Sequence, residues 1–322
     1  MKIQDFIVIN NLTLGITTVA FSKNQLLVDK VKKLGFKKVY INENFKRFTQ
    51  VELIEFLSKC DLAIVGLDNI KEDILSKVPK LRAISKYGVG LDNIDFEACK
   101  KYNTEVLHTQ GVNKRSVSEL TLGCVLSLLR NIYISSNLLK QNIWEKNGGT
   151  QLSNKTIGII GVGNIGKDLI DLLQAFNCKI LVNDIIEQKD YYKKYNLIEA
   201  SKEEIYKNAD VITIHTPLNE STRYIINKKS LSMMKTNTIV INTARGGIIN
   251  LEDLKWALKN GIIAGAAIDA YEIEPPKDLE LLSLANLINT PHIGGNSTEA
   301  IQAMGESAIE NILNWIKNGN NR

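Results

Sequence analysis

The strongest constraint on the fold is a regular alternation of short apolar, β-branched runs with amphipathic segments along nearly all 322 residues. Runs such as LGITTVAF (14–21) and DLAIVGL (61–67) have the length and composition of buried strands, whereas TQVELIEFLSKC (49–60) carries apolar residues at helical spacing. Strands that alternate with helices form parallel sheets joined by helical crossovers. A second series of the same kind starts near residue 156, so the sequence predicts two α/β domains, each a doubly wound parallel sheet.

The expected domain boundaries follow from where the two series begin and end. The first series ends with TEVLHTQG (104–111), and the second sheet is complete before the last amphipathic segment, 297–319. That segment can therefore return to the first domain. We predict a first domain formed by 1–107 with 298–322, and a second domain, 108–297, inserted into it, with a cleft between the two.

The stretch between the two series, 115–140, predicts one long helix. Ser116 and Glu119 have the spacing of a capping box, so we expect the helix to begin at Ser116. Its apolar positions cover nearly all faces, which favours burial between domains or between subunits. Its most apolar part, 117–129, contains Glu119 and is too short for a membrane span.

Charge and cysteine content narrow the class of function. The 40 basic and 35 acidic residues are interleaved, and no block of Lys and Arg marks a nucleic-acid-binding face. The N-terminal stretch MKIQDFIVINNL (1–12) is too short and too polar for a secretion signal. The four cysteines are far apart, which is typical of a reduced intracellular protein. We expect a cytoplasmic protein with no nucleic-acid partner, no membrane partner and no metal site.

Gly161, Gly163 and Gly166 form a GxGxxG motif in TIGIIGVGNIGKDL, between a five-residue apolar strand and an amphipathic helix. Gly161 permits the tight turn, Gly163 lets a pyrophosphate approach the backbone, and Gly166 lets helix and strand pack closely. The first N–H groups of the helix would then face the phosphates. This context predicts a Rossmann dinucleotide site; the alternative is a glycine-rich turn without a ligand.

Asp184 ends the next predicted strand, KILVND, where a carboxylate can accept hydrogen bonds from the adenosine ribose hydroxyls. The same charge would repel a 2′-phosphate, and the following residues, Ile185 and Ile186, supply no arginine to hold one. The sequence therefore favours NAD over NADP, with a plain surface aspartate as the alternative.

Three ionisable residues follow three successive predicted strands. Arg245 lies in NTARGG, Glu274 in DAYEIEPP and His292 in TPHIGG. Arginine can bind a carboxylate bidentately, histidine can give a proton to a carbonyl oxygen, and a nearby glutamate would favour the imidazolium. Together they suit the reduction of a 2-keto acid by hydride, or its reverse.

For each of these three assignments, the sequence offers an alternative residue or an alternative role. Glu272 lies two positions from Glu274 and is an alternative partner. His215 and His108 also follow predicted strands and compete with His292 for the acid role. Arg245 could be an ordinary surface residue. The spacing places these side chains at one sheet edge but does not choose among them.

The chain resembles the D-isomer-specific 2-hydroxyacid dehydrogenases, which include phosphoglycerate dehydrogenase and hydroxypyruvate reductases. The resemblance covers about residues 60–300. It rests on motifs in the expected order: SKYGVGLDNIDFEAC, NKRSVSELTLG, GIIGVGNIG, HTPLNESTRYII, NTARGG, AAIDAYEIEPP and NTPHIGG. It implies a Rossmann NAD domain inserted into a flavodoxin-like substrate domain, usually in a dimer formed through the long helix and the segment around IWEKNG (143–148).

The resemblance also implies roles for individual residues. Arg245 would bind the substrate carboxylate and carbonyl, with His292 as acid/base and Glu274 as its partner. The substrate would also meet Val89, Gly90 and Asn113. The implied cofactor-binding residues are Gly161, Gly163, Asn164, Ile165, Gly166, Asp184, His215, Thr216, Pro217, Thr243, Ala244, Asp269, Gly294 and Gly295.

Two features depart from phosphoglycerate dehydrogenases. Gly66 stands where those enzymes carry a phosphate-binding arginine, and Asp68 follows it, although Lys86 and Tyr87 could compensate. The sequence also ends soon after the last helix, so no appended regulatory domain is expected.

These observations predict an NAD-dependent oxidoreductase that interconverts a small (R)-2-hydroxy acid and its 2-keto acid. One alternative is a relative that acts on another substrate, such as formate or phosphite. Another is an NAD-sensing binding protein on the same fold, as in the C-terminal-binding-protein corepressors.

Overall fold

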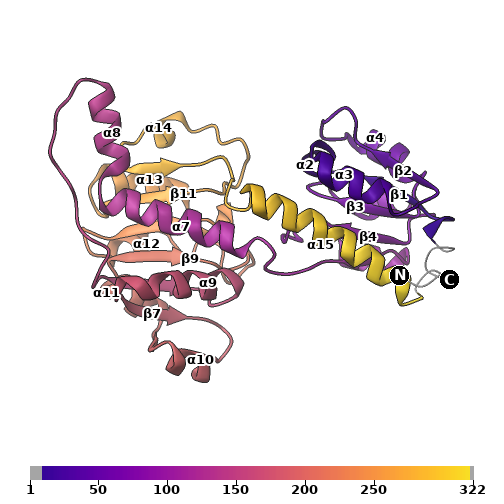
Figure 1. Cartoon of the computed structure of the whole chain (residues 1–322). Helices are drawn as coiled ribbons and strands as arrows, with labels where there is room; N and C mark the ends of the chain where they lie inside the picture. The colour runs from indigo at the N-terminus through magenta and orange to yellow at the C-terminus, as the bar shows by residue number, and fades with distance from the viewer. Residues whose placement is uncertain (1–8, 320–322) are drawn as a thin grey trace. The chain divides into compact units, whose positions relative to one another are not determined.

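The computed structural model describes residues 9–319, so the first eight residues of the N-terminal stretch 1–12 lie outside the described part. The chain forms two compact units (Figure 1). The first takes in the described residues up to Asn113 and those from Asn296 on, and the second is Lys114–Gly295. Each unit is a parallel sheet covered by helices, which confirms the predicted α/β class.

The first unit has a five-stranded sheet in the order β2-β1-β3-β4-β5, with all neighbours parallel. This is the flavodoxin-like order of a doubly wound sheet. Its strands are β1 (Thr13–Ile16), β2 (Lys38–Ile41), β3 (Leu62–Val65), β4 (Ala83–Lys86) and β5 (Glu105–Leu107). Its helices are α2 (Val19–Lys23), α3 (Gln25–Lys32), α4 (Gln50–Leu57), α5 (Glu72–Leu75), α6 (Phe96–Lys101) and α15 (Thr298–Lys317).

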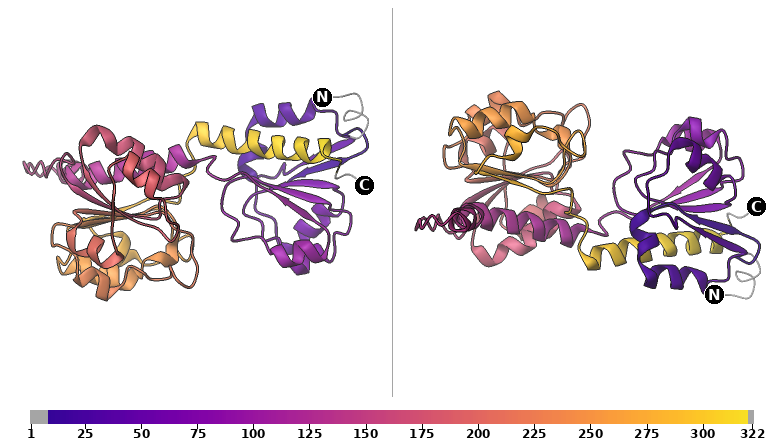
Figure 2. Two further views of the ribbon diagram at one scale, coloured as in Figure 1. Left: turned by 90° about the horizontal axis from the view of Figure 1, so that it is seen from below. Right: turned by 90° about the horizontal axis from the view of Figure 1, so that it is seen from above.

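Alternate residues of each central strand enter different cores. Leu62 and Ile64 pack with residues of α2, α3 and α15, whereas Ala63 and Val65 pack with residues of α4, α5 and α6. Successive side chains of a strand point to opposite faces of the sheet, and helices cover both faces here. Every position of the strand is therefore buried, and its sequence is one continuous apolar run. Figure 2 shows the two helical layers of each unit.

The second unit has a seven-stranded parallel sheet in the order β12-β11-β10-β9-β6-β7-β8. This is the Rossmann order extended by one strand at the β12 edge. Its strands are β6 (Thr156–Ile160), β7 (Lys179–Asn183), β8 (Ile198–Glu199), β9 (Val211–Ile214), β10 (Ile239–Asn242), β11 (Gly265–Ile268) and β12 (Leu287–Asn289). Its helices are α7 (Lys114–Leu129), α8 (Ile132–Lys140), α9 (Asn164–Leu173), η1 (Gln174–Phe176), α10 (Lys189–Lys194), α11 (Lys202–Asn208), α12 (Lys228–Ser232), η2 (Gly246–Ile248), α13 (Leu251–Lys259) and α14 (Leu279–Leu282).

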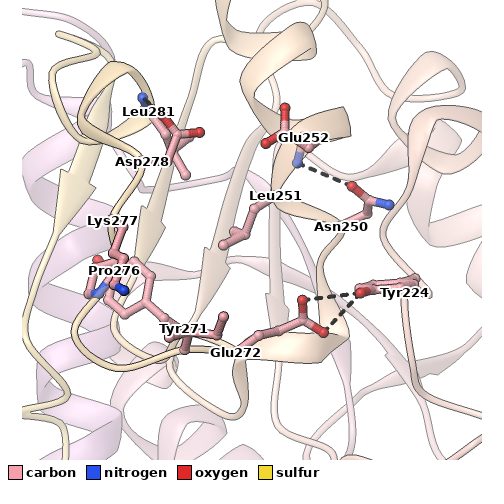
Figure 3. A pocket seen from close by; sticks show the side chains of 11 residues that line it. Tyr224, Asn250, Leu251, Glu252, Tyr271, Glu272, Pro276, Lys277, Asp278 and Leu281 are labelled. Carbon is pink, nitrogen blue, oxygen red and sulfur yellow. Dashed lines mark hydrogen bonds between the residues drawn. The ribbon is translucent and has the colours of Figure 1, made fainter.

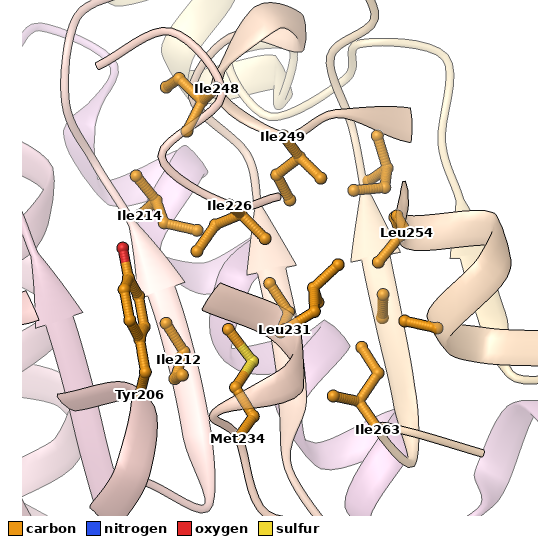
Figure 4. Packing of buried hydrophobic residues seen from close by; sticks show 14 of the residues in the cluster. Tyr206, Ile212, Ile214, Ile226, Leu231, Met234, Ile248, Ile249, Leu254 and Ile263 are labelled. Atoms are coloured by element: carbon orange, nitrogen blue, oxygen red, sulfur yellow. The ribbon is translucent and has the colours of Figure 1, made fainter. Parts of the chain in front are cut away.

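Two apolar layers sandwich this second sheet. Residues of α7 and α9 pack on one face, and residues of α11, α12 and α13 pack on the other. In the latter core, Leu231 and Leu254 belong to the same buried cluster as the strand residue Ile212 and as Met234 and Ile263 (Figure 4). The packing holds the carboxyl ends of the strands in fixed positions at one edge.

Two predicted elements differ from the structure. The run 14–21 is not one strand, because β1 ends at Ile16 and α2 begins at Val19. The predicted helix 115–140 is two helices, since Asn131 takes a left-handed conformation (φ 53°) between α7 and α8. The first of them also begins at Lys114, two residues before Ser116.

The two helices differ in burial. α7 buries seven residues within the second unit, whereas α8 buries none. Among residues 9–319, no single helix has the length and hydropathy to cross a membrane. α7 and α8 reach those values only when taken together, and they are bent by 63° at their junction.

Replacing Leu254 with alanine should lower the free energy of unfolding of the second unit by roughly 2–5 kcal/mol, since the side chain is fully buried. Urea denaturation of the two variants measures the effect. Leu279→Ala is the matched control, because Leu279 is 77% exposed, and its effect should stay within about 0.5 kcal/mol. Equal stability of the two variants would contradict the assigned core.

Candidate active site

The glycine-rich turn between β6 and α9 is shaped by close backbone contacts. Gly161 has φ +98°, and a Cβ there would lie 2.7 Å from the His215 carbonyl carbon. A Cβ on Gly166 would lie 2.2 Å from the Gly161 carbonyl oxygen. Gly163 differs, since a Cβ there would meet nothing within 4 Å. Two glycines therefore pack the turn, and the third leaves its backbone open at the start of α9, where phosphates bind in dinucleotide sites.

Two buried polar atoms border this turn without a hydrogen-bond partner among the described residues. They are Nδ1 of His215 and Oγ1 of Thr216. A buried polar atom without a partner is costly, and a ligand with complementary groups would remove that cost. The turn and its neighbours therefore fit a dinucleotide in their chemistry.

The other ring nitrogen of His215, Nε2, lies 2.9 Å from the Thr213 hydroxyl. Burial lowers the pKa of His215 to about 4, so the ring is neutral near pH 7. A neutral imidazole cannot serve as a charged proton donor, which argues against His215 in that role.

Asp184 lies directly after β7. Its Oδ2 accepts from the Val162 backbone N–H at 2.6 Å, and its Oδ1 accepts from the Ile186 N–H at 2.8 Å. The carboxylate is therefore fixed against the glycine-rich turn. Each oxygen keeps a second lone pair that could accept from a ribose hydroxyl.

Glu274, rather than Glu272, lies beside His292. Nδ1 of His292 and Oε1 of Glu274 are 2.8 Å apart. The Glu272 carboxylate instead accepts from Arg223 Nη1 at 2.8 Å and from the Tyr224 hydroxyl at 2.9 Å. The structure therefore separates the two glutamates by their partners, which the sequence alone left open.

Arg245 follows β10 in a loop that packs against the loop of Glu274. A Cβ on Gly246 would lie 2.1 Å from the backbone carbon of Tyr271, so only glycine fits there. Asn242 Nδ2 donates to the Arg245 carbonyl at 2.8 Å, and Arg245 Nη1 donates to the Ala244 carbonyl at 2.8 Å. Since β10, β11 and β12 are neighbours in the sheet, Arg245, Glu274 and His292 follow three adjacent strand ends.

Asp269 holds the loop of His292 in place, a role that the sequence did not reveal. Its side chain is 1% exposed. Oδ1 accepts from the Thr290 hydroxyl at 2.7 Å and from the Ile293 N–H at 2.8 Å, and Oδ2 accepts from the Gly294 N–H at 2.8 Å. His292 itself has φ +55°, a conformation that costs free energy unless neighbouring bonds enforce it.

Several other predicted cofactor residues lie around the same edge. The Thr243 hydroxyl is 2.9 Å from the hydroxyl of Thr121, which ties this position to α7. The Pro217 carbonyl accepts from the Thr222 hydroxyl at 2.7 Å. Asn164 and Ile165 form the first turn of α9, and Gly295 ends the second unit.

The predicted substrate residues Val89, Gly90 and Asn113 belong to the first unit. Val89 and Gly90 lie in the half-exposed loop after β4, and Asn113 has a buried Oδ1 without a partner among the described residues. Lys86, considered above as a phosphate-binding group, is only 4% exposed. Its ammonium donates to the Gly66 carbonyl and to Asn93 Oδ1, so it braces two loops.

A separate hollow of about 310 Å³ lies beside α13. Figure 3 shows the Tyr224 hydroxyl bonded to the Glu272 carboxylate at its wall. Arg245, Glu274 and His292 are not among its lining residues. Among residues 9–319, no group of three or more His, Cys, Asp or Glu side chains is placed to hold a metal ion.

The second unit thus defines a nucleotide-binding oxidoreductase domain with acid/base groups at its sheet edge. Residues 122–294 match the family described as D-isomer specific 2-hydroxyacid dehydrogenase, NAD binding domain. The chain belongs to the D-isomer-specific 2-hydroxyacid dehydrogenase family, and its second unit is the NAD-binding domain.

Curated relatives agree with this assignment. The chain is 38% identical over 273 residues to D-3-phosphoglycerate dehydrogenase of Methanocaldococcus jannaschii, covering 84% of this chain and 52% of the relative. It is 35% identical over 297 residues to hydroxypyruvate reductase of Thermotoga maritima, covering 90% and 96%. The chain therefore spans about half the length of the phosphoglycerate dehydrogenase but nearly all of the reductase.

A solved structure agrees as well. The crystal structure of D-lactate dehydrogenase from Aquifex aeolicus, complexed with NAD and lactic acid, is similar with a TM-score of 0.81 and 26% identity. The match covers 96% of each chain.

Asp184→Ala should raise the Kd for NADH by about tenfold to a hundredfold, because it removes a charged acceptor of the ribose and loosens the glycine-rich turn. It should also narrow the preference for NADH over NADPH. Fluorescence titration with each dinucleotide measures both effects. Asp190→Ala, an exposed acid on α10, is the control and should bind NADH as the wild type does. Unchanged affinity and preference in Asp184→Ala would contradict the ribose role.

Proposed function

We propose that the protein is an NAD-dependent oxidoreductase that interconverts a small (R)-2-hydroxy acid and its 2-keto acid. The observation that carries this proposal is the 2.8 Å contact between His292 Nδ1 and Glu274 Oε1, on the strand ends next to that of Arg245. Membership of the family and the NAD-binding domain support it.

The proposed mechanism assigns one task to each residue. Arg245 binds the substrate carboxylate through its guanidinium. Glu274 holds a proton on Nδ1 of His292, so that the imidazolium gives its other proton, from Nε2, to the carbonyl oxygen. NADH, when bound, supplies the hydride to the carbonyl carbon. In the reverse direction, neutral His292 takes the hydroxyl proton.

We further propose that the substrate is unphosphorylated. Gly66 offers no side chain for a phosphate, and the Lys86 ammonium already donates to the Gly66 carbonyl and to Asn93. The Asp68 carboxylate lies in the same loop and accepts from the Thr17 hydroxyl. Small acids such as glyoxylate, hydroxypyruvate and pyruvate are therefore the first to assay, with phosphohydroxypyruvate as the contrasting substrate.

The partner proposed for α8 and for the segment 143–148 that follows it, called the arm below, is a second copy of this chain. Ile132 and Leu139 of α8 and Ile143 and Trp144 of the arm are exposed apolar side chains, with Trp144 76% exposed. A patch of this kind marks an interaction surface. The protein would act in the cytoplasm, with no nucleic-acid or membrane partner, in keeping with its interleaved charges and free cysteines.

Replacing His292 with alanine should lower kcat for 2-keto acid reduction by roughly 10²–10⁴-fold, the usual loss for a general acid. A panel of 2-keto acids, followed by NADH absorbance, first finds the substrate and then measures the variant. His108→Ala is the matched control and should keep wild-type turnover. Turnover lost in His108→Ala and kept in His292→Ala would overturn the assignment. An absence of turnover with every acid would favour a binding protein over an enzyme.

Replacing Trp144 with aspartate should convert the dimer into a monomer, because a charge in an apolar interface is poorly tolerated. Light scattering coupled to size exclusion gives the mass. Leu279→Asp places the same charge on an equally exposed leucine outside the patch and should stay dimeric. A monomeric wild type, or a dimeric Trp144→Asp protein, would contradict the proposed interface.

A further inference from the structure

The first turn of α7 faces two different parts of the second unit. Arg115 and Ser118 point toward α9, whereas Ser116 and Val117 point toward the loop of His292. α7 and α9 pack side by side on one face of the sheet (Figure 1). A single helical turn therefore contacts both the helix that opens at the glycine-rich turn and the loop that carries the acid/base histidine.

Contact with the histidine loop is made at the Gly294 peptide. The Ser116 hydroxyl donates to the Gly294 carbonyl at 2.6 Å, while the Gly294 N–H donates to Asp269 Oδ2 at 2.8 Å. A Cβ on Gly294 would lie 2.9 Å from that oxygen and 3.6 Å from Val117 Cγ2. Gly294, two residues after His292, is therefore held through both its N–H and its carbonyl.

Contact with the coenzyme helix is made at Asp168, in the second turn of α9. Arg115 reaches its carboxylate with Nε at 3.0 Å and Nη2 at 3.1 Å, and the Ser118 hydroxyl donates to the same group. Asp168 is buried, so its charge is compensated by these donors. This bidentate pair fixes the first turn of α7 relative to α9.

We propose that Ser116 is a positioning residue, which aims His292 by anchoring the Gly294 peptide to the turn of α7 that Asp168 fixes on α9. The arrangement links α9, which opens at the glycine-rich turn, to the loop of His292 within one compact unit. His292 needs such a link, because its positive φ is not a conformation that a histidine keeps without external bonds. The proposal rests on the proposed function for its kinetic consequence.

Ser116→Ala removes only the hydroxyl, and alanine is a good helix former, so α7 should remain intact. With the substrate that the panel of 2-keto acids identifies, we expect kcat to fall by about tenfold. This is the loss expected when one hydrogen bond of ordinary strength no longer stabilises the transition state. The Kd for NADH and the KM for the 2-keto acid should change by less than about twofold, since the groups that bind each are untouched. Amide hydrogen exchange in residues 290–295 should become faster.

Ser127→Ala is the matched control, because Ser127 lies on the same helix and its hydroxyl makes no hydrogen bond among residues 9–319. It should match the wild type in kcat and in exchange. Ser116→Thr restores a hydroxyl and should recover most of the kcat, a rescue that general loss of stability would not produce. Wild-type kcat and exchange in Ser116→Ala would overturn the proposal, as would a failure of threonine to restore either.

The exchange measurement does not depend on turnover. If the wild type reduces none of the 2-keto acids, the proposed function fails, yet faster exchange at 290–295 in Ser116→Ala alone would still support the anchoring role. Slow exchange in that variant would refute the anchoring whatever the reaction proves to be.

Discussion

The buried carboxylate of Asp269 is the interaction on which the arrangement of the candidate site depends. It follows β11, and it accepts three hydrogen bonds from the segment that follows β12. Those bonds bend the chain sharply after Pro291, and they hold His292 in a left-handed conformation. Without an acceptor at this point, the two N–H groups would need water, and the strain at His292 would relax. The contact between His292 and Glu274 is thus a consequence of how Asp269 shapes the loop.

The parallel sheet supplies the other condition for the site. Because β10, β11 and β12 run in the same direction as neighbours, their carboxyl ends present three loops side by side. Gly246 lets the first loop touch the second, and Gly294 lets the third loop approach the Asp269 carboxylate. Gly246 in NTARGG and Gly294 in TPHIGG are therefore required by packing between loops, in addition to any room that they leave for a coenzyme.

Much of this could be predicted from the sequence, because the signals are local. Alternating apolar runs and helices predicted both sheets, and the glycine motif was recognised from the strand before it and the helix after it. Interactions between distant segments were missed. Ser116 and Glu119 matched a capping box, but the Ser116 hydroxyl bonds to Gly294, 178 positions away. The choice between Glu272 and Glu274 likewise depended on Arg223 and Tyr224, which no local pattern connects to them.

Lys86 illustrates why a charge in a motif does not by itself define a substrate. From sequence, a lysine just before the substrate loop is a candidate phosphate ligand. In the fold it lies at the end of β4 with its ammonium bonded to the Gly66 carbonyl and to Asn93 Oδ1. Asn93 in turn donates to the Asp68 carbonyl, so the loops after β3 and β4 are joined by one polar network.

To bind a phosphate there, the Lys86 ammonium would have to leave the Gly66 carbonyl and Asn93 Oδ1, and these two acceptors would lose their hydrogen bonds. The free-energy cost of that loss is comparable with the gain from the new ion pair. An arginine in place of Gly66 would bring its own donors, but its Cβ would lie 2.8 Å from the Thr18 hydroxyl oxygen, so Thr18 would have to move. The Lys86 ammonium is therefore already engaged in the loop network of this chain, and a lysine at this position of the sequence does not by itself provide a cation for a phosphate.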